Sequence, residues 1–143
     1  MKGAIQSLDV SYLLHATEDA DRVAAAVREL IGSEAPFEFE DLEGHFGNSI
    51  RKVSLHLHGE DATGAFTRLT ARMPVMLKKS VAGDIDRLVD EHSSLYLRFD
   101  KQQLVQGGIA AGHDDAIRLK VKPRAFLVHG HARDFFLGQL KGK

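Results

Sequence analysis

The sequence predicts an α+β domain of two layers, in which a mostly antiparallel sheet carries helices packed on one face. Strand-like alternation and helix-like periodicity are both present, but they do not follow the strict strand, helix, strand order of a parallel sheet. The chain has 143 residues, of which 43% are apolar, so one core of ordinary size can form. We therefore expect a single domain over residues 1–143, with the other face of its sheet free to bind a partner.

The first two elements are a strand and a helix. Residues 5–15 mix β-branched and aliphatic residues with polar ones and predict a strand. Thr17 is expected to cap the following helix, whose first turn carries several carboxylates at the positive end of the helix dipole. Apolar residues recur at intervals of three and four over residues 20–31, and Gly32 is expected to end this helix.

A hairpin and a second helix come next. Residues 37–40 and 52–58 alternate apolar and polar side chains on either side of a glycine-containing turn at 44–49, which is typical of a β-hairpin. Asp61 is expected to cap a second helix, and Pro74 predicts its end.

Several shorter elements fill the rest of the chain. We expect one or two short helices between residues 75 and 91, a turn or short helix at 102–106 and a short strand at Ile109. A turn at 112–115 precedes a basic strand, and residues 134–140 are expected to form a last helix.

One strand is predicted by Leu95, Leu97 and Phe99, which alternate with Tyr96 and Arg98. Because a strand with this alternation buries one side and exposes the other, we expect the three apolar residues in the core. Tyr96 and Arg98 should then face outward at the end of a sheet. An aromatic ring beside a guanidinium group suits nucleic acid.

The basic strand covers residues 117–122, where aliphatic side chains alternate with Arg118, Lys120 and Lys122. If this strand shares a sheet with the preceding one, their outward sides combine these cations with Arg98 in one flat cationic surface. Phosphates bind such surfaces.

Charge is distributed unevenly along the chain, although the formal net charge is only −1. Residues 1–49 carry a net charge of −7, whereas residues 50–143 carry +6. Such asymmetry indicates a surface for a polyanion. The alternative is an ordinary solvated strand face.

Composition excludes several classes of protein and site. Without cysteine there is no disulfide, thiolate metal site or cysteine nucleophile. The sequence has no phosphate-binding loop and no dinucleotide fingerprint, so no nucleotide cofactor is expected. No apolar run approaches the roughly 20 residues of a membrane span, and the N-terminal residues do not form a signal peptide. We expect a cytoplasmic protein without membrane contact.

Two His-x-His pairs, at residues 56–58 and 129–131, could each direct two ring nitrogens to one side. Zinc needs further donors, which the sequence does not place nearby, so no metal site is predicted. Asp100, Asp114 and Asp115 could belong to a hydrolase, but no nucleophile and base are positioned beside them. We expect structural roles for these carboxylates and no enzyme activity.

Another candidate is the turn around His45 and Asn48. These two polar residues alternate with glycines, which allow the backbone to approach a ligand closely. A tight turn is the alternative explanation for the same glycines.

Four blocks of sequence together resemble a known family. In order, these read HATED at 15–19, GHFGN at 44–48, LYLRFDKQ at 95–102 and DAIR at 115–118. They resemble an archaeal family of RNA-binding proteins labelled a predicted exosome subunit, over about residues 5–122. The resemblance implies a fold similar to the ribosomal protein that binds 5S ribosomal RNA, RNA as the ligand, and no established catalysis. The positions it carries over are His45, Asn48, Arg98, Lys101 and Arg118.

The leading hypothesis is therefore a non-catalytic RNA-binding protein that acts as an accessory to RNA processing or to the archaeal exosome. Lys52 and Lys101 would neutralise phosphates together with the basic strand, Arg98 would clamp a phosphate or stack, and Tyr96 would stack on a base.

One alternative is a protein-interaction subunit of an RNA-processing assembly, docking through an acidic block. This block consists of Glu34, Glu38, Glu40, Asp41 and Glu43. A metal-dependent RNA hydrolase is the other alternative, and the oligomeric state is left open.

Overall fold

The structure is a computed structural model that describes residues 4–43, 47, 49–124 and 131–141. Strands and helices alternate irregularly along these residues. Their order is β1 (Ile5–His15), α1 (Ala20–Ile31), β2 (Glu38–Glu43), β3 (Ser49–His58), α2 (Gly59–Arg72), α3 (Val75–Gly83), α4 (Ile85–Leu88), β4 (Leu95–Asp100), α5 (Lys101–Val105), β5 (Ala116–Pro123) and α6 (His131–Lys141).

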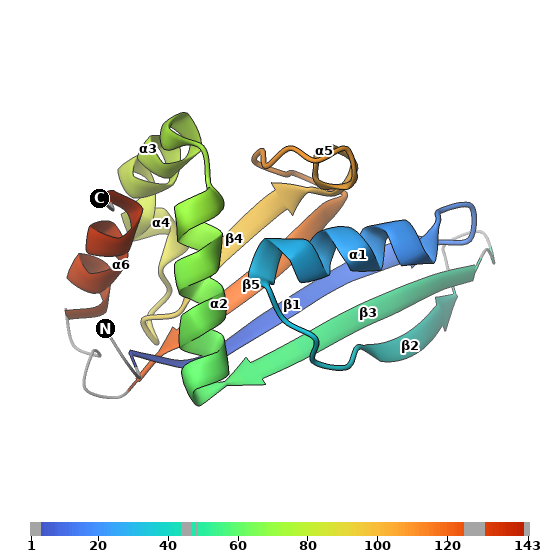
Figure 1. Cartoon of the computed structure of the whole chain (residues 1–143), viewed down its shortest axis with the longest axis horizontal. Helices are drawn as coiled ribbons and strands as arrows, with labels where there is room; N and C mark the ends of the chain where they lie inside the picture. Colours follow the sequence, from blue (N-terminus) through green and yellow to red (C-terminus); the bar gives the residue numbers. More distant parts are fainter. Residues whose placement is uncertain (1–3, 44–46, 48, 125–130, 142–143) are drawn as a thin grey trace.

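All five strands of the described residues form one sheet in the order β2-β3-β1-β5-β4. Each strand is antiparallel to its neighbours. The helices lie on one face of this sheet, and the opposite face carries none of the described helices (Figure 1). The predicted two-layer α+β fold is thus confirmed. No described helix has the length and apolar character that a membrane span requires.

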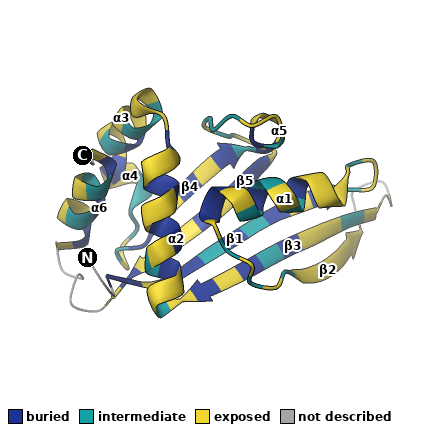
Figure 2. Cartoon of the chain, in the orientation of Figure 1, coloured by how far each residue is buried: buried dark blue, intermediate teal, exposed yellow. Residues whose placement is uncertain are grey.

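The core lies between the sheet and the helix layer, to which all six described helices contribute buried residues. The alternating apolar residues of the strands supply the side of the core formed by the sheet. Figure 2 shows buried and exposed residues following one another along β1, β3, β4 and β5. Leu95, Leu97 and Phe99 are at most 3% exposed, as predicted. Since the polar residues between the buried ones point away from the helices, the open face of the sheet is defined by sequence parity.

The cap of helix α1 lies two residues later than predicted. Its N-cap is Asp19, whose Oδ1 accepts hydrogen bonds from the backbone N–H groups of Asp21 and Arg22 at 3.1 and 3.2 Å. Thr17 lies in the preceding turn, so the prediction that it caps the helix was wrong. At the other end Gly32 adopts φ +63°, a left-handed conformation that confirms the predicted C-cap.

Helix α2 begins two residues before the predicted cap. Its N-cap is His58, which makes no capping hydrogen bond through its side chain, and Asp61 lies inside the first turn. There the carboxylate of Asp61 interacts favourably with the helix dipole, but Asp61 is not the N-cap residue. The helix ends at Arg72, ahead of Pro74, as predicted.

The remaining elements follow the predictions with shifted bounds. The β2–β3 hairpin, the short helices α3, α4 and α5, and the last helix α6 are all present. In place of a strand at Ile109, a single bridge joins Ala111 to Phe99. Gly112 follows this bridge and lies close against the β4 backbone, where a Cβ atom would meet the Phe99 carbonyl carbon at 2.6 Å.

Candidate nucleic-acid interface

The candidate interface is the sheet face opposite the helices, called the open face here. The strand registers place polar side chains side by side on it. Its exposed cations lie mainly on the two adjacent strands β4 and β5. We call this part the cationic half, and it consists of Tyr96, Arg98, Arg118, Lys120 and Lys122.

Arg98 and Arg118 are directly opposite each other across β4 and β5, and both are exposed. Like charges in opposed positions of a sheet destabilise it. Among the described residues, neither guanidinium group takes part in an ion pair or a side-chain hydrogen bond. The pair therefore concentrates positive charge that an external anion can neutralise.

Tyr96 and Lys120 form the next opposed pair along the same two strands. The Lys120 amine lies 5.8 Å from the centre of the Tyr96 ring, within the range of a cation–π contact. Tyr96 is 41% exposed, which is high for so large an aromatic side chain. The pair presents an aromatic surface and a cation together, the combination that binds single-stranded nucleic acid.

Asp90 holds the Tyr96 ring in place from the turn before β4. Its Oδ2 accepts a hydrogen bond from the Tyr96 hydroxyl at 2.9 Å, and its Oδ1 accepts from the backbone N–H groups of His92 and Ser94. Partial desolvation raises the pKa of Asp90, but the hydrogen bonds from Ser94, Tyr96 and His92 outweigh it and lower the pKa below its usual value. The carboxylate thus stays ionised and restrains the ring.

Lys122 and Lys52 extend the positive charge in two directions. Lys122 is exposed and opposite Ser7 of β1, at the far end of β5. Lys52 is exposed on β3 and opposite Leu13 of β1. Since β1 separates β3 from β5, Lys52 stands about 10 Å from the basic strand, counted across two strand spacings.

A small hollow lies between the two groups of cations. It has a volume of about 50 Å³ and is lined among others by Lys52, Arg118, Ser11 and Asp115. Such a volume holds one or two water molecules, not a nucleobase. Any base bound here must lie on the surface of the sheet.

Lys101 is not on the open face, contrary to prediction. Its side chain is fully buried. Its Nζ lies 2.7 Å from Glu18 Oε1, 2.9 Å from Asp115 Oδ1 and 2.8 Å from the backbone oxygen of Leu13. An ammonium group with three such partners, away from water, is part of the fold and cannot contact a phosphate.

The other predicted candidates fall outside this surface. His45 and Asn48 lie outside the described residues, as does His129. Both ring nitrogens of His56 face carboxylates, with Nδ1 at 2.7 Å from Asp9 Oδ1 and Nε2 at 3.8 Å from Glu38 Oε1. Within the ranges that the structure describes, no three His, Asp or Glu side chains are placed to hold a metal ion.

Two of the carboxylates considered for catalysis and expected to be structural make contacts within the fold. Asp100 caps α5, since its Oδ2 accepts a hydrogen bond from the Gln103 N–H at 2.8 Å. Asp115 is bound to Lys101. Both arrangements match the structural roles expected for these residues.

The open face changes sign across its width. On the β2 side, Glu38 and Glu40 are opposite Ser54 and Lys52 of β3 and share their face. Asp9 of β1 lies between the two sides. A polyanion is therefore attracted to the β4–β5 side and repelled from the β2 side.

Sequence reasoning missed two residues of this surface. Asp90 restrains Tyr96, and its position in a turn just before the strand was the signal available. Leu13 is 37% exposed beside Lys52 and Ser11, at an outward position of β1. Its parity relative to Leu8 and Val10 would have placed it there.

Comparisons with known proteins identify relatives of this chain. The model of a family described as RNA binding matches residues 7–123. The RNA-binding protein PAB1135 of Pyrococcus abyssi is 29% identical over 135 residues, which cover 88% of each chain. Protein MJ0213 of Methanocaldococcus jannaschii is 31% identical over 126 residues, covering 80% of this chain and 81% of its own.

A solved structure shows the same fold. Protein AF2318 of Archaeoglobus fulgidus superposes with a TM-score of 0.79 at 22% identity, over 92% of this chain and 96% of that chain. The family match begins in β1 and ends with β5, so it includes the whole cationic half.

Proposed function

This chain belongs to the RNA-binding family whose model it matches over residues 7–123, and we propose that it binds RNA across the cationic half of its open face. The observation that carries this proposal is the opposed pair Arg98 and Arg118, exposed on neighbouring strands without an ion-pair partner among the described residues. Phosphate oxygens supply the charge that this pair lacks.

Each member of the cationic half has a distinct role in the proposal. Arg98 and Arg118 bind phosphate groups, and Lys120 and Lys122 continue the line of positive charge along β5. Tyr96 stacks on a base with the ring face that Lys120 leaves open. Lys52 binds a neighbouring phosphate on the other side of Leu13.

We further propose that this binding is non-catalytic. The protein would then act as an accessory to RNA processing, for example by the exosome. The structural contacts of Asp100 and Asp115 support the non-catalytic part, since each carboxylate has a partner within the fold. The archaeal exosome and the likeness to a 5S-RNA-binding ribosomal protein remain predictions from the family resemblance.

Filter binding of a short oligouridylate at several salt concentrations tests the proposal. In the double variant Arg118→Ala/Lys120→Ala, the magnitude of the slope of log affinity against log salt should fall by about 1.4, since each phosphate contact on a single strand contributes about 0.7. The variant should fold, because removal of Arg118 relieves a like-charge pair.

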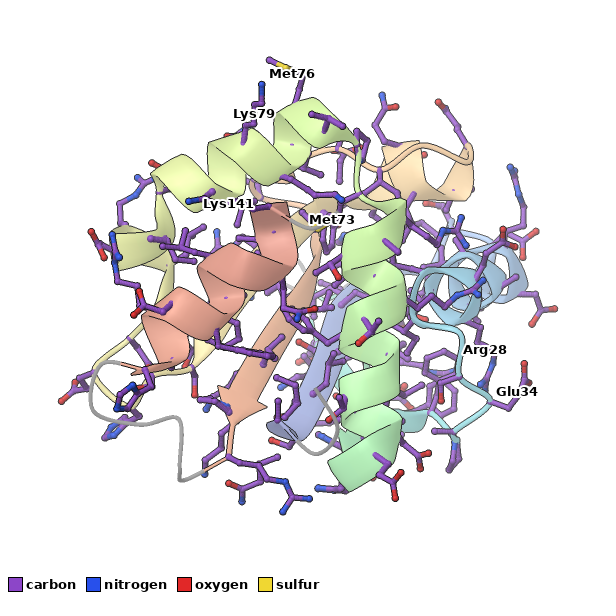
Figure 3. The ribbon with its side chains drawn as sticks, turned by 60° about the vertical axis from the view of Figure 1, so that its left-hand side comes forward. Arg28, Glu34, Met73, Met76, Lys79 and Lys141 are labelled. Carbon is purple, nitrogen blue, oxygen red and sulfur yellow. The ribbon has the colours of Figure 1, made fainter. Side chains whose placement is uncertain are left out.

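The matched control is Lys79→Ala/Lys141→Ala. These two exposed lysines belong to α3 and α6, among the helices and away from the open face (Figure 3). The control should keep the wild-type slope while losing the same net charge. Equal slopes for the wild type and the β5 double variant would overturn the proposal.

A further inference from the structure

The two outer edges of the sheet differ in how their backbone groups are used. At the β4 edge, the Asp100 N–H donates to the Ala110 oxygen at 2.9 Å, and the Gly112 N–H donates to the Arg98 oxygen at 3.0 Å. The segment after α5 thus closes this edge. At the opposite edge, β2 pairs with β3 and with no other described residue.

β2 is nevertheless held firmly at its start. The Arg28 Nη1 donates to the backbone oxygens of Ser33 and Ala35 at 3.1 and 2.9 Å, and its guanidinium carbon lies 4.4 Å from the centre of the Phe37 ring. Figure 3 shows Arg28 and Glu34 at this connection between α1 and β2. Arg28 thus fixes the segment that leads into β2. Within the part of the chain that the structure describes, the outer edge of β2 leaves a row of backbone donors and acceptors unpaired, and such a row can pair with another chain.

The side chains of β2 give this edge a defined chemistry on each face. Glu38 and Glu40 are exposed on the open face, at alternate positions. Phe39 points to the opposite face and is 60% exposed, although one side of its ring lies 5.5 Å from the Arg51 guanidinium. That guanidinium also binds Asp41 at 2.9 Å, on the same face as Phe39. On the open face, Glu38 lies 3.8 Å from His56 Nε2 and Glu40 is opposite Lys52, but both carboxylates are exposed and can also attract an external cation.

We propose that the outer edge of β2 binds an extended, basic segment of a partner protein by strand addition. The segment pairs its backbone with β2 and places Lys or Arg at alternate positions, beside Glu38 and Glu40. The residues between these cations are apolar and cover Phe39 on the other face. The cationic half proposed for RNA lies at the opposite edge of the sheet, on β4 and β5, and only Lys52 is next to both surfaces.

Charge complementarity selects this occupant over the others. A second copy of the chain pairing through β2 would bring Glu38 and Glu40 against the same acidic strand, and like charges in such positions destabilise a sheet. An RNA strand is repelled by the same carboxylates. The acids that prevent self-association therefore favour a cationic strand.

The test uses a synthetic peptide of alternating lysine and valine, titrated into ¹⁵N-labelled protein. Amide shifts should concentrate in β2 and β3. The same peptide with N-methyl groups on alternate residues keeps its charge but cannot form the ladder, and should lose binding. No binding by the first peptide, equal binding by both peptides, or shifts centred elsewhere would each overturn the proposal.

Matched charge reversals provide a second readout. Glu38→Lys/Glu40→Lys should weaken binding of the lysine–valine peptide at least about ten-fold, because two attractive cross-strand pairs become repulsive. Glu60→Lys/Glu91→Lys reverses two exposed acids on α2 and in the turn before β4, and should leave the affinity unchanged. Equal weakening by both double variants would mean general charge attraction and would contradict docking at β2.

Discussion

The amino group of Lys101 joins three parts of the chain that are far apart in sequence. It binds the backbone at Leu13 near the end of β1, the carboxylate of Glu18 before α1, and the carboxylate of Asp115 before β5. Removing the cation leaves Glu18, whose side chain is only 15% exposed, without the charge that compensates it and with only the His15 N–H as a hydrogen-bond donor among the described residues. Breaking an ion pair of this kind is strongly destabilising.

Lys101→Met should therefore lower the free energy of unfolding by about 3 kcal/mol, measured by urea denaturation. The salt dependence of oligouridylate binding by the folded variant should equal that of the wild type, since Lys101 is buried away from the open face. A lower salt slope with unchanged stability would show that Lys101 contacts RNA instead.

Asp90 provides a pH-dependent contribution to stability. Its pKa is lower in the folded protein than the ordinary value of 3.8. The contribution is therefore complete above the unfolded pKa and is lost as the pH falls through the folded pKa. Asp90→Asn should be less stable than the wild type at pH 7, with the difference shrinking below about pH 4.

Denaturation of Asp90→Asn and the wild type between pH 2.5 and 7 measures this difference. Tyr96→Phe removes one of the three hydrogen bonds to the carboxylate and should show a smaller pH dependence of the same sign. A difference that stays constant over this pH range would contradict the assigned role of Asp90.

At the residue scale, alternation correctly predicted which strand residues are exposed, but it did not predict the burial of Lys101. The outward positions of Tyr96, Arg98 and Arg118 are confirmed by their exposure. Lys101 is the first residue of α5, directly after β4 ends at Asp100, so the alternation of the strand does not specify its burial. Its charge suggested a surface position, because the two carboxylates that compensate it are distant in sequence.

At the scale of elements, the start of α1 depends on which of several polar residues reaches the free backbone N–H groups. Asp19 accepts two of them, and Thr17 makes no such contact. Asp19→Ala should therefore lower the free energy of unfolding by about 1 kcal/mol, and Thr17→Ala should change it by only a few tenths. Thermal or urea denaturation distinguishes the two, and the reverse order would contradict this N-cap.

Helix periodicity and the hairpin turn predicted which elements exist, because both signals are local. The starts of α1 and α2 were misplaced, since adjacent polar residues offer competing caps and the turn geometry decides among them. The strand order could not be read from the sequence at all. β1 lies between β3 and β5 through contacts that span most of the chain, and no local pattern specifies them.

At the scale of the whole molecule, the strand order converts a division along the sequence into a division across one surface. The acidic N-terminal part supplies β2 at one edge of the sheet, and the cationic C-terminal part supplies β4 and β5 at the other. The charge asymmetry was predicted from composition. Its arrangement on a single open face follows only from the fold, which puts the surface that we propose for RNA and the edge that we propose for protein docking at opposite edges of one sheet.

Mapping of backbone amide shifts in ¹⁵N-labelled protein during titration with an oligouridylate tests the central proposal most directly. The shifts should be largest in β4 and β5, extend to Lys52 on β3, and be small in α1, α2 and β2. Shifts centred on the helix layer, with β4 and β5 unchanged at saturation, would contradict RNA binding on the open face.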